Sequence, residues 1–315
     1  MPATVEGRYR FPGIAPATFE HPLDRAALDA LRRTPGLDTL FRKLSSLHFE
    51  RQVRLYFTGD SLRLSPGQCP RLYNLMREAA DVLDLEPPEL YMMQAPFPNA
   101  VAIGMDRFTL VCTTGLVNVL NDDELRAVMG HEMGHMKSGH MLYRTIAIFL
   151  STLGVLAARN LPVVQILSHA LMYAFYDWFR KSELTADRAG LLVAQDPDVS
   201  VRVLLKLVAG TQVADQQLDP AEFLKQADDF EDMDSSILNV LYKFEMTRFQ
   251  SHPFPALRAR EIVRWAESDA YRGILSGAYE RVSGAATSRV CGRCACRVEN
   301  PMFRFCPECG AELPG

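Results

Sequence analysis

The stretch of sequence that decides the fold is HEMGH, residues 131–135. A capping-box pattern that begins at Asn121 predicts a helix through this stretch. Residues four positions apart lie on one face of a helix, so the imidazoles of His131 and His135 can bind one zinc ion. Glu132 then lies close enough to polarise a water molecule bound to that ion. The stretch therefore predicts a metal centre, although two surface histidines on a polar helix would give the same letters.

A zinc centre of this kind needs a third protein ligand and a fourth position for water. The nearest histidine, His140, would lie about half a turn from His131 on a continued helix, and we interpret it as a solvated or capping residue. Further along, Glu183 and Asp187 share one helical face. Glu183 could bind the metal, and Asp187 could accept the outer N–H of a ligand histidine and fix its tautomer. The alternative is an ordinary acidic helix start in solvent.

The spacing of apolar residues predicts the rest of the architecture. Residues 22–84 and 116–270 have mostly helical periodicity. Between them lie three short apolar runs, residues 90–94, 100–103 and 108–113, separated by proline, glycine and aspartate. Such runs are typical of short strands, and we expect a small antiparallel meander. The predicted fold class is α+β, mainly helical.

The composition excludes several classes of protein. With 315 residues, 48% of them hydrophobic, the chain can bury a substantial core and is neither a peptide nor a disordered tail. Its 34 basic and 38 acidic residues leave a formal net charge of -4, so no global positive field exists to hold nucleic acid or an anionic membrane. Residues 1–19 show no basic start followed by an apolar run, so we expect no signal peptide and a cytoplasmic protein.

One apolar region competes with the cytoplasmic interpretation. Residues 145–158 are mostly apolar, but this run falls short of the roughly 20 residues that span a bilayer. The next run, residues 161–179, is interrupted by proline and polar residues. Buried core helices are therefore the better interpretation of both runs. The alternative is association with a membrane through residues 141–179, because basic residues flank one side of this region.

Five of the seven cysteines lie close together near the C-terminus. Two CxxC pairs in this region can supply four thiolates to a tetrahedral structural zinc, namely Cys291, Cys294, Cys306 and Cys309. Cys296 is interpreted as a small buried residue. Acidic residues offset the basic residues around the pairs, so we expect contact with a protein partner or a tethering role, and no nucleic acid. The pattern predicts a zinc ribbon that needs its metal to fold.

These features divide the chain into four parts. Residues 1–69 are expected to form a largely helical N-terminal extension, and residues 70–272 the domain that carries the histidine motif. Residues 273–289 are rich in glycine, serine and alanine and are interpreted as a linker. Residues 290–315 form the predicted zinc ribbon.

Four motifs in this order resemble a known family, the gluzincin-type metallopeptidases that include HtpX and the CAAX prenyl proteases. They are Asn99-Ala100, the HEMGH stretch, the Glu183-x-x-Ala-Asp187 motif, and Ser251-His252-Pro253 followed by Arg258. The resemblance runs from about Leu72 to Trp265. It implies a zincin-type domain, and this chain departs from the membrane members because it lacks the spans that they carry before the histidine motif.

The resemblance also implies roles for individual residues. His131, His135 and Glu183 would be the ligands of a catalytic zinc, and Glu132 the general base. His252 and Arg258 would lie in the cleft and steady the oxyanion of the tetrahedral intermediate. An extended substrate would add a strand to the edge formed by Asn99, Ala100, Val101, Ala102 and Ile103.

The leading hypothesis is therefore a zinc-dependent endopeptidase that hydrolyses extended or unfolded polypeptides, with Glu132 activating a zinc-bound water. Two alternatives belong to other classes. One is a polypeptide-binding or chaperone-like protein that keeps the fold and metal without turnover, and the other is an adaptor that acts through its zinc ribbon. The intact Glu132 favours the enzyme, since a binding protein has no use for a general base there.

Overall fold

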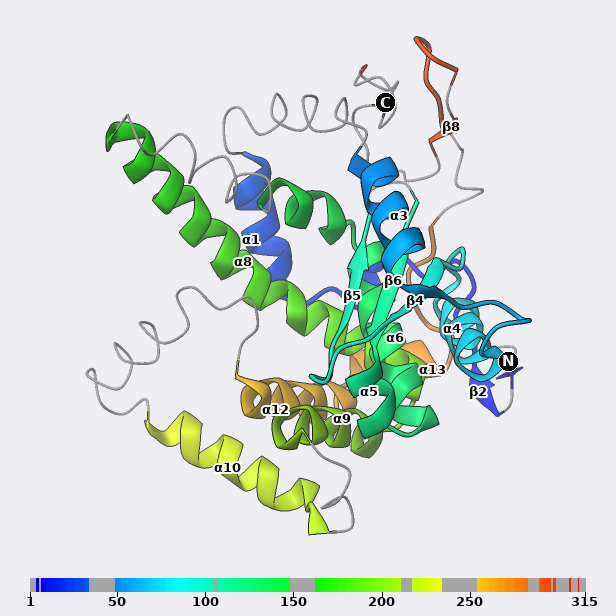
Figure 1. Cartoon of the computed structure of the whole chain (residues 1–315). Helices are drawn as coiled ribbons and strands as arrows, with labels where there is room; N and C mark the ends of the chain where they lie inside the picture. Colours follow the sequence, from blue (N-terminus) through cyan, green and yellow to red (C-terminus); the bar gives the residue numbers. More distant parts are fainter. Residues whose placement is uncertain are drawn as a thin grey trace.

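The computed structural model of the chain describes residues 4–5, 7–33, 49–104, 107–147, 162–210, 217–233, 254–282, 289–295, 297–298, 306 and 311. Helices dominate these residues, and Figure 1 shows them gathered around one small sheet. The helices are η1 (Pro16–Thr18), α1 (Pro22–Arg32), α3 (Phe49–Asp60), α4 (Pro70–Leu83), α5 (Thr114–Val119), α6 (Asp122–Lys137), α8 (Pro162–Ala194), α9 (Pro197–Ala209), α10 (Pro220–Asp232), α12 (Pro255–Ala266) and α13 (Asp269–Leu275). The expected mainly helical fold with a small sheet is confirmed.

The sheet contains the three strands expected from the sequence and one more. They are β3 (Leu62–Arg63), β4 (Glu89–Met93), β5 (Ala100–Ile103) and β6 (Thr109–Thr113), in the order β3-β4-β6-β5. β5 and β6 pair antiparallel, as do β3 and β4, but β4 and β6 are parallel. The predicted antiparallel meander is therefore wrong in this pairing, and the sheet is mixed. The proline-rich segment 94–99 makes no tight hairpin; it carries the chain past the position that β6 then fills.

Two-stranded pairs lie near each end of the chain. β1 (Thr4–Val5) pairs with β2 (Arg8–Tyr9), and β7 (Arg289–Val290) pairs with β8 (Arg297–Val298), both antiparallel. Residues between these pairs and the helices also pack inward. Phe11, Ile14 and Phe19 are fully buried in the main core, and Ile14 forms a β-bridge with Arg281. The N-terminal residues therefore belong to the same core as the central helices.

α6 and α8 approach each other closely because small residues line their contact. A Cβ atom on Gly130 would lie 2.6 Å from Cγ2 of Val193, and one on Gly134 would lie 2.5 Å from Cβ of Ala189. Any larger side chain at either position would push the two helices apart. This contact positions the site, since α6 carries the HEMGH stretch and α8 carries Glu183.

The apolar region that raised the membrane alternative lies partly in α8. Residues 148–161 are outside the described residues, whereas Phe175 and Trp178 of α8 are fully buried among side chains of α1 and α8. Within the described segments, none of the helices combines the length and apolar character that crossing a bilayer requires.

Candidate metal centre

The HEMGH stretch lies on a helix that begins as expected. The side chain of Asn121 accepts a hydrogen bond from the backbone N–H of Glu124, and Glu124 Oε2 accepts one from the N–H of Asn121, which together form the capping box. His131 and His135 then lie one turn apart on α6 and face Glu183 of α8. The predicted starting point of the helix is confirmed.

The three expected metal ligands converge. Nε2 of His131 lies 3.3 Å from Oε2 of Glu183, and Nε2 of His135 lies 3.2 Å from Oε1. One ligand atom from each residue falls within 4.8 Å of the others. Two imidazole nitrogens and one carboxylate oxygen are the donor set of many catalytic zinc sites.

His131 is held by Asp187 of α8, which is itself held by Arg258 of α12. Its Nδ1 lies 3.0 Å from Oδ1 of Asp187, and Arg258 donates to both carboxylate oxygens of Asp187 at 2.6 and 2.8 Å. Burial lowers the pKa of His131, but the hydrogen bonds and charges of Asp187 and Glu183 outweigh it and raise that pKa to about 9. Asp187 therefore lies where it can fix the histidine tautomer.

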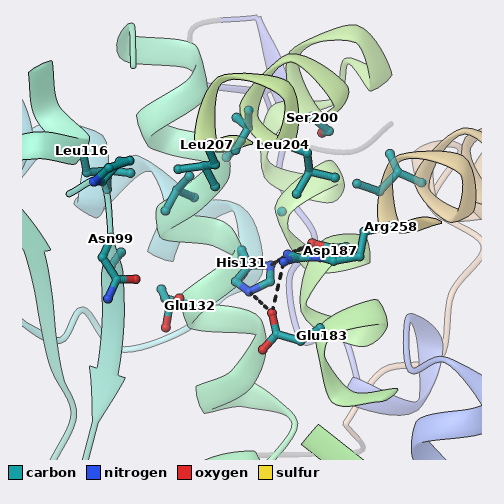
Figure 2. A pocket seen from close by; sticks show the side chains of 17 residues that line it. Asn99, Leu116, His131, Glu132, Glu183, Asp187, Ser200, Leu204, Leu207 and Arg258 are labelled. Atoms are coloured by element: carbon teal, nitrogen blue, oxygen red, sulfur yellow. Dashed lines mark hydrogen bonds and ion pairs between the residues drawn. The ribbon is translucent and has the colours of Figure 1, made fainter. Parts of the chain in front are cut away.

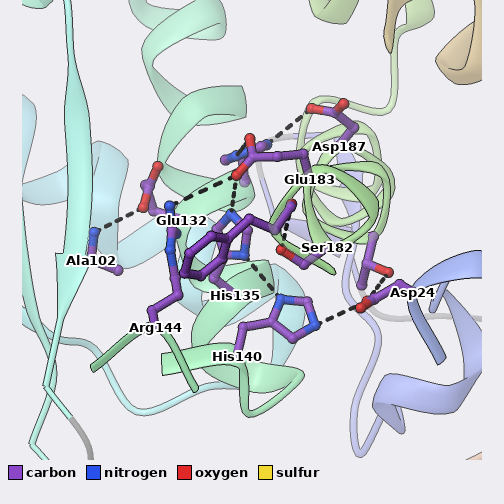
Figure 3. A network of polar contacts seen from close by, with 12 residues as sticks. Asp24, Ala102, Glu132, His135, His140, Arg144, Ser182, Glu183 and Asp187 are labelled. Atoms are coloured by element: carbon purple, nitrogen blue, oxygen red, sulfur yellow. Dashed lines mark hydrogen bonds and ion pairs between the residues drawn. The ribbon is translucent and has the colours of Figure 1, made fainter. Parts of the chain in front are cut away.

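His135 is held from the opposite side, by residues that the sequence analysis did not assign. Its Nδ1 lies 2.9 Å from Nδ1 of His140, and Nε2 of His140 lies 3.0 Å from Oδ2 of Asp24 on α1 (Figure 3). All three side chains are buried, His135 and His140 completely. The interpretation of His140 as solvated is therefore wrong. The helix α6 ends at Lys137, so the chain turns at Gly139 and brings the ring of His140 inward.

Glu132 faces the free edge of the sheet. Its Oε2 accepts a hydrogen bond of 2.8 Å from the N–H of Ala102. Burial raises the pKa of Glu132, while the positive charges of His131 and Arg144 oppose this rise. A buried carboxylate with a raised pKa is suited to accept and return a proton near neutral pH.

Arg144 is a further polar residue at the site that sequence reasoning missed. Its guanidinium lies 3.8 Å from Oε1 of Glu183, and Figure 3 shows it reaching toward Glu132 and Glu183. Its charge acts together with burial to lower the pKa of His135 well below the usual value. An arginine after a helix has no distinctive sequence signal, so only the fold reveals its place.

A cleft opens beside His131. Its polar lining consists of side chains of the metal centre, including Glu132, Asp187 and Arg258, together with Asn99 and Ser200. In Figure 2 the leucines of the lining lie on the other side of His131 from Glu183. The apolar wall is formed by Pro98, Ala100, Leu116, Ala127, Val128, Val203, Leu204, Leu207 and Ile262.

The expected substrate-binding strand is at the edge of the sheet. Among the strands that the structure describes, β5 pairs on one side only, with β6, and the backbone carbonyl of Asn99 accepts the N–H of Thr113. Hydrogen-bonded pairs alternate along an antiparallel ladder, so Ala100 and Ala102 direct their backbone groups to the free edge. The bond from Ala102 to Glu132 agrees with this direction. The side chains of Val101 and Ile103 pack against the small hydrophobic cluster around Tyr91.

Two expected sites reach beyond the described residues. His252 lies outside them, and its predicted role stays a prediction. Cys309 lies outside them as well, but Cys291, Cys294 and Cys306 bring their sulfur atoms together, with 3.4 Å between Sγ of Cys294 and Sγ of Cys306. Three cysteines at this spacing suggest a zinc ribbon.

A helix with two histidines and a glutamate, a carboxylate from the next helix and an open edge strand define the class of HExxH metallopeptidases. The family model for peptidase family M48 matches residues 66–266. The chain belongs to peptidase family M48. Its membership supports a metalloprotease function, and metallopeptidases of this family are zinc-dependent.

Individual relatives agree with this assignment. The chain is 39% identical over 263 residues to the plastoglobule-localized metallopeptidase 48, chloroplastic, of Arabidopsis thaliana. The aligned region covers 82% of this chain and 75% of the relative. It is 34% identical over 115 residues to a protease HtpX homolog of Moorella thermoacetica, covering 36% of this chain and 38% of that protein. No solved structure matches. The expected resemblance to HtpX-like proteases is confirmed.

Proposed function

We propose that this protein is a zinc-dependent metalloendopeptidase that hydrolyses peptide bonds in extended or unfolded polypeptides. The observation that carries the proposal is the convergence of His131, His135 and Glu183 beside Glu132 and the free edge of β5. A binding protein would need the edge strand but not the carboxylate.

The residues present fit a zinc ion. The Nδ1 atoms of His131 and His135 are taken by Asp187 and His140, which leaves both Nε2 atoms directed at Glu183. Nε2 of His135 is buried, and none of the described residues forms a hydrogen bond with it. His131, His135 and Glu183 would hold the zinc ion, which when bound would supply a water of lowered pKa, near about 7, and polarisation of the scissile carbonyl.

Glu132 supplies the proton transfer that hydrolysis needs. It lies next to His131 in the sequence and lines the same cleft, so its carboxylate can take the proton of the attacking water. The same group then gives that proton to the leaving amine. The N–H of Ala102 holds the carboxylate in place from β5.

The substrate would bind along β5. The outward backbone groups of Ala100 and the outward carbonyl of Ala102 can pair with an extended polypeptide, whereas the N–H of Ala102 is already bound to Glu132. Such backbone pairing tolerates many sequences. The leucines and valines of the cleft wall favour an apolar side chain next to the cleaved bond. Asn99 lines the same cleft and can bind the substrate backbone.

Arg258 is already engaged in the described structure. Two of its nitrogens, Nε and Nη2, donate to Asp187, and the third guanidinium nitrogen, Nη1, lies 3.4 Å from Oε2 of Glu183. We propose that it acts mainly by holding Asp187 against His131. The role of His252 and Arg258 in steadying the oxyanion stays a prediction.

The cysteine cluster is proposed to hold a second, structural zinc through Cys291, Cys294, Cys306 and Cys309. We propose that this ribbon contacts a protein partner. The Arabidopsis relative is, as its name says, localized to plastoglobules. A cytoplasmic location for this chain stays a prediction from its sequence.

The proposed function is tested by cleavage of a casein-like unfolded protein. Glu132→Gln keeps the size of the side chain but cannot accept the proton, so cleavage should fall by at least about 100-fold. Equal cleavage by the wild type and the variant at matched zinc content would refute the catalytic assignment. If neither protein cleaves but both bind unfolded chains, the chaperone-like alternative is correct.

A further inference from the structure

A chain of buried polar groups connects His135 to helix α1. His140 lies between them, with Nδ1 at 2.9 Å from His135 and Nε2 at 3.0 Å from Asp24. Helix α1 ends at Arg32, whereas the match to peptidase family M48 begins at residue 66. A residue outside the matched region thus reaches the metal centre through one intermediate side chain.

The geometry points to Asp24 and His140 as positioning residues that hold His135 in the tautomer and orientation its metal requires. This inference rests on the proposed function, because it takes His135 to be a metal ligand. The inference goes beyond the proposed function because it assigns to Asp24 of α1 the role of holding His140 against this ligand.

If a metal ion is bound to Nε2 of His135, the hydrogen-bonding capacities of the three groups leave one consistent arrangement. A carboxylate only accepts, so the proton between Asp24 and His140 belongs to Nε2 of His140. Nδ1 of this neutral His140 is then an acceptor, and Nδ1–H of His135 donates to it. Nε2 of His135 is left with a lone pair that faces Glu183 and the proposed metal.

Asp24 is itself firmly held. Its Oδ1 accepts from Nε1 of Trp178 at 2.9 Å, and its Oδ2 accepts from the hydroxyl of Thr185 at 2.5 Å. Only 1% of its surface is exposed. Burial would raise the pKa of Asp24, but His140, Thr185 and Trp178 outweigh this effect and lower it below the usual value. The carboxylate therefore stays ionised and acts as a fixed acceptor.

Trp178 and Thr185 lie on α8, the helix that also carries Glu183. Asp24 thus connects α8, which carries Glu183, to His140, which supports His135. Because both connections are buried and short, a displacement of α1 would change the direction of the His135 ring.

The test measures metal binding by the full chain with zinc already in its cysteine site. Cobalt is added to the histidine site, and its visible absorption reports both affinity and coordination geometry. Zinc keeps the cysteine site because its affinity for protein ligands exceeds that of cobalt. His140→Leu removes the acceptor for His135, and we expect cobalt affinity to fall about 10- to 100-fold with an altered spectrum.

Two matched pairs of variants separate positioning from general loss of stability. In His140→Asn, Oδ1 takes the place of Nδ1 as the acceptor, so this variant should recover most of the affinity that His140→Leu loses. Asp24→Ala removes the acceptor for His140 and should weaken binding. Thr185→Val removes the bond to Asp24 and the bond from the backbone N–H of His21, but it leaves Asp24 as the acceptor for His140, so it should weaken cobalt binding less than Asp24→Ala does.

Three results would overturn the inference. They are a wild-type spectrum and affinity for His140→Leu, no recovery in His140→Asn, and an equal loss in Thr185→Val and Asp24→Ala. If Asp24→Ala does not fold, the His140 pair decides alone. Failure of the proposed function looks different, because the wild type itself would then bind no cobalt at this site.

Discussion

The two ligand histidines lie one turn apart on α6, yet the protein holds them in opposite ways. His131 is 12% exposed, lines the cleft, and is supported by Asp187 and Arg258. His135 is completely buried and is supported by His140 and, behind it, Asp24. The first support comes from α8 and α12, and the second from α1 and the turn after α6.

This difference gives the two rings different chemistry. The carboxylates around His131 raise its pKa to about 9, whereas burial and Arg144 lower the pKa of His135. The two histidines of one motif are thus both proposed metal ligands, one at the cleft and one in the core.

The largest effect is expected from breaking the support of His131. Asp187→Leu leaves Arg258 as a buried charge without its main partner, which costs about 3–5 kcal/mol of unfolding free energy. It also frees the ring of His131, so zinc affinity should fall about 10- to 100-fold. Chemical denaturation and competition with a zinc chelator measure the two effects.

The double variant Asp187→Leu with Arg258→Met is the control. It removes both charges, so much of the lost stability should return. The zinc affinity should not return with it. Recovery of both quantities together would show that Asp187 supports the fold and not His131.

A smaller effect is expected from separating the two helices that carry the ligands. In Gly134→Ala the new Cβ would lie 2.5 Å from Cβ of Ala189, so α6 and α8 must shift, at a cost of about 1–3 kcal/mol. Both histidines move relative to Glu183, and zinc affinity should fall as well. Thermal unfolding and chelator competition test this.

Gly59→Ala in α3 is the matched control, because a Cβ there meets nothing within 4 Å. An alanine is the better helix former, so this variant should gain about 0.5–1 kcal/mol. A Gly134→Ala protein as stable as the wild type would contradict the close packing of α6 on α8.

The sequence predicted those parts of the site that depend on local spacing. The capping box, the HEMGH stretch and the Glu183–Asp187 motif each lie within a few residues, so helical geometry alone places their side chains. The order of the strands was predicted less well, because the parallel pairing of β4 with β6 depends on where the segment 94–99 leads the chain. His140 and Asp24 were missed for a similar reason: their contact forms only when α1 packs on α8.

The smallest effect concerns the contact between α1, which supports His135, and α12, which supports His131. His21, which caps α1, lies 3.6 Å from Glu261 of α12. The polar contact with His21, together with the hydrogen bond and charge of Arg264, lowers the pKa of Glu261 from 4.5 to about 2. A lowered pKa stabilises the fold at pH values above 4.5, and this contribution is lost as the pH falls toward 2.

Glu261→Gln should therefore lose less than about 1 kcal/mol at pH 6, since the group is partly exposed. The difference from the wild type should shrink as the pH is lowered to 3. Urea denaturation at a series of pH values measures this difference. A constant difference over that range would show that the charge of Glu261 is not involved.

The central claim is that His131, His135 and Glu183 hold one metal ion and the cysteines hold another. Counting the zinc in the purified full chain by elemental analysis tests it most directly. The account predicts two zinc ions per chain in the wild type and in Glu132→Gln, and one in Glu183→Ala, which loses a ligand. Two zinc ions retained by Glu183→Ala, or one in the wild type, would contradict it.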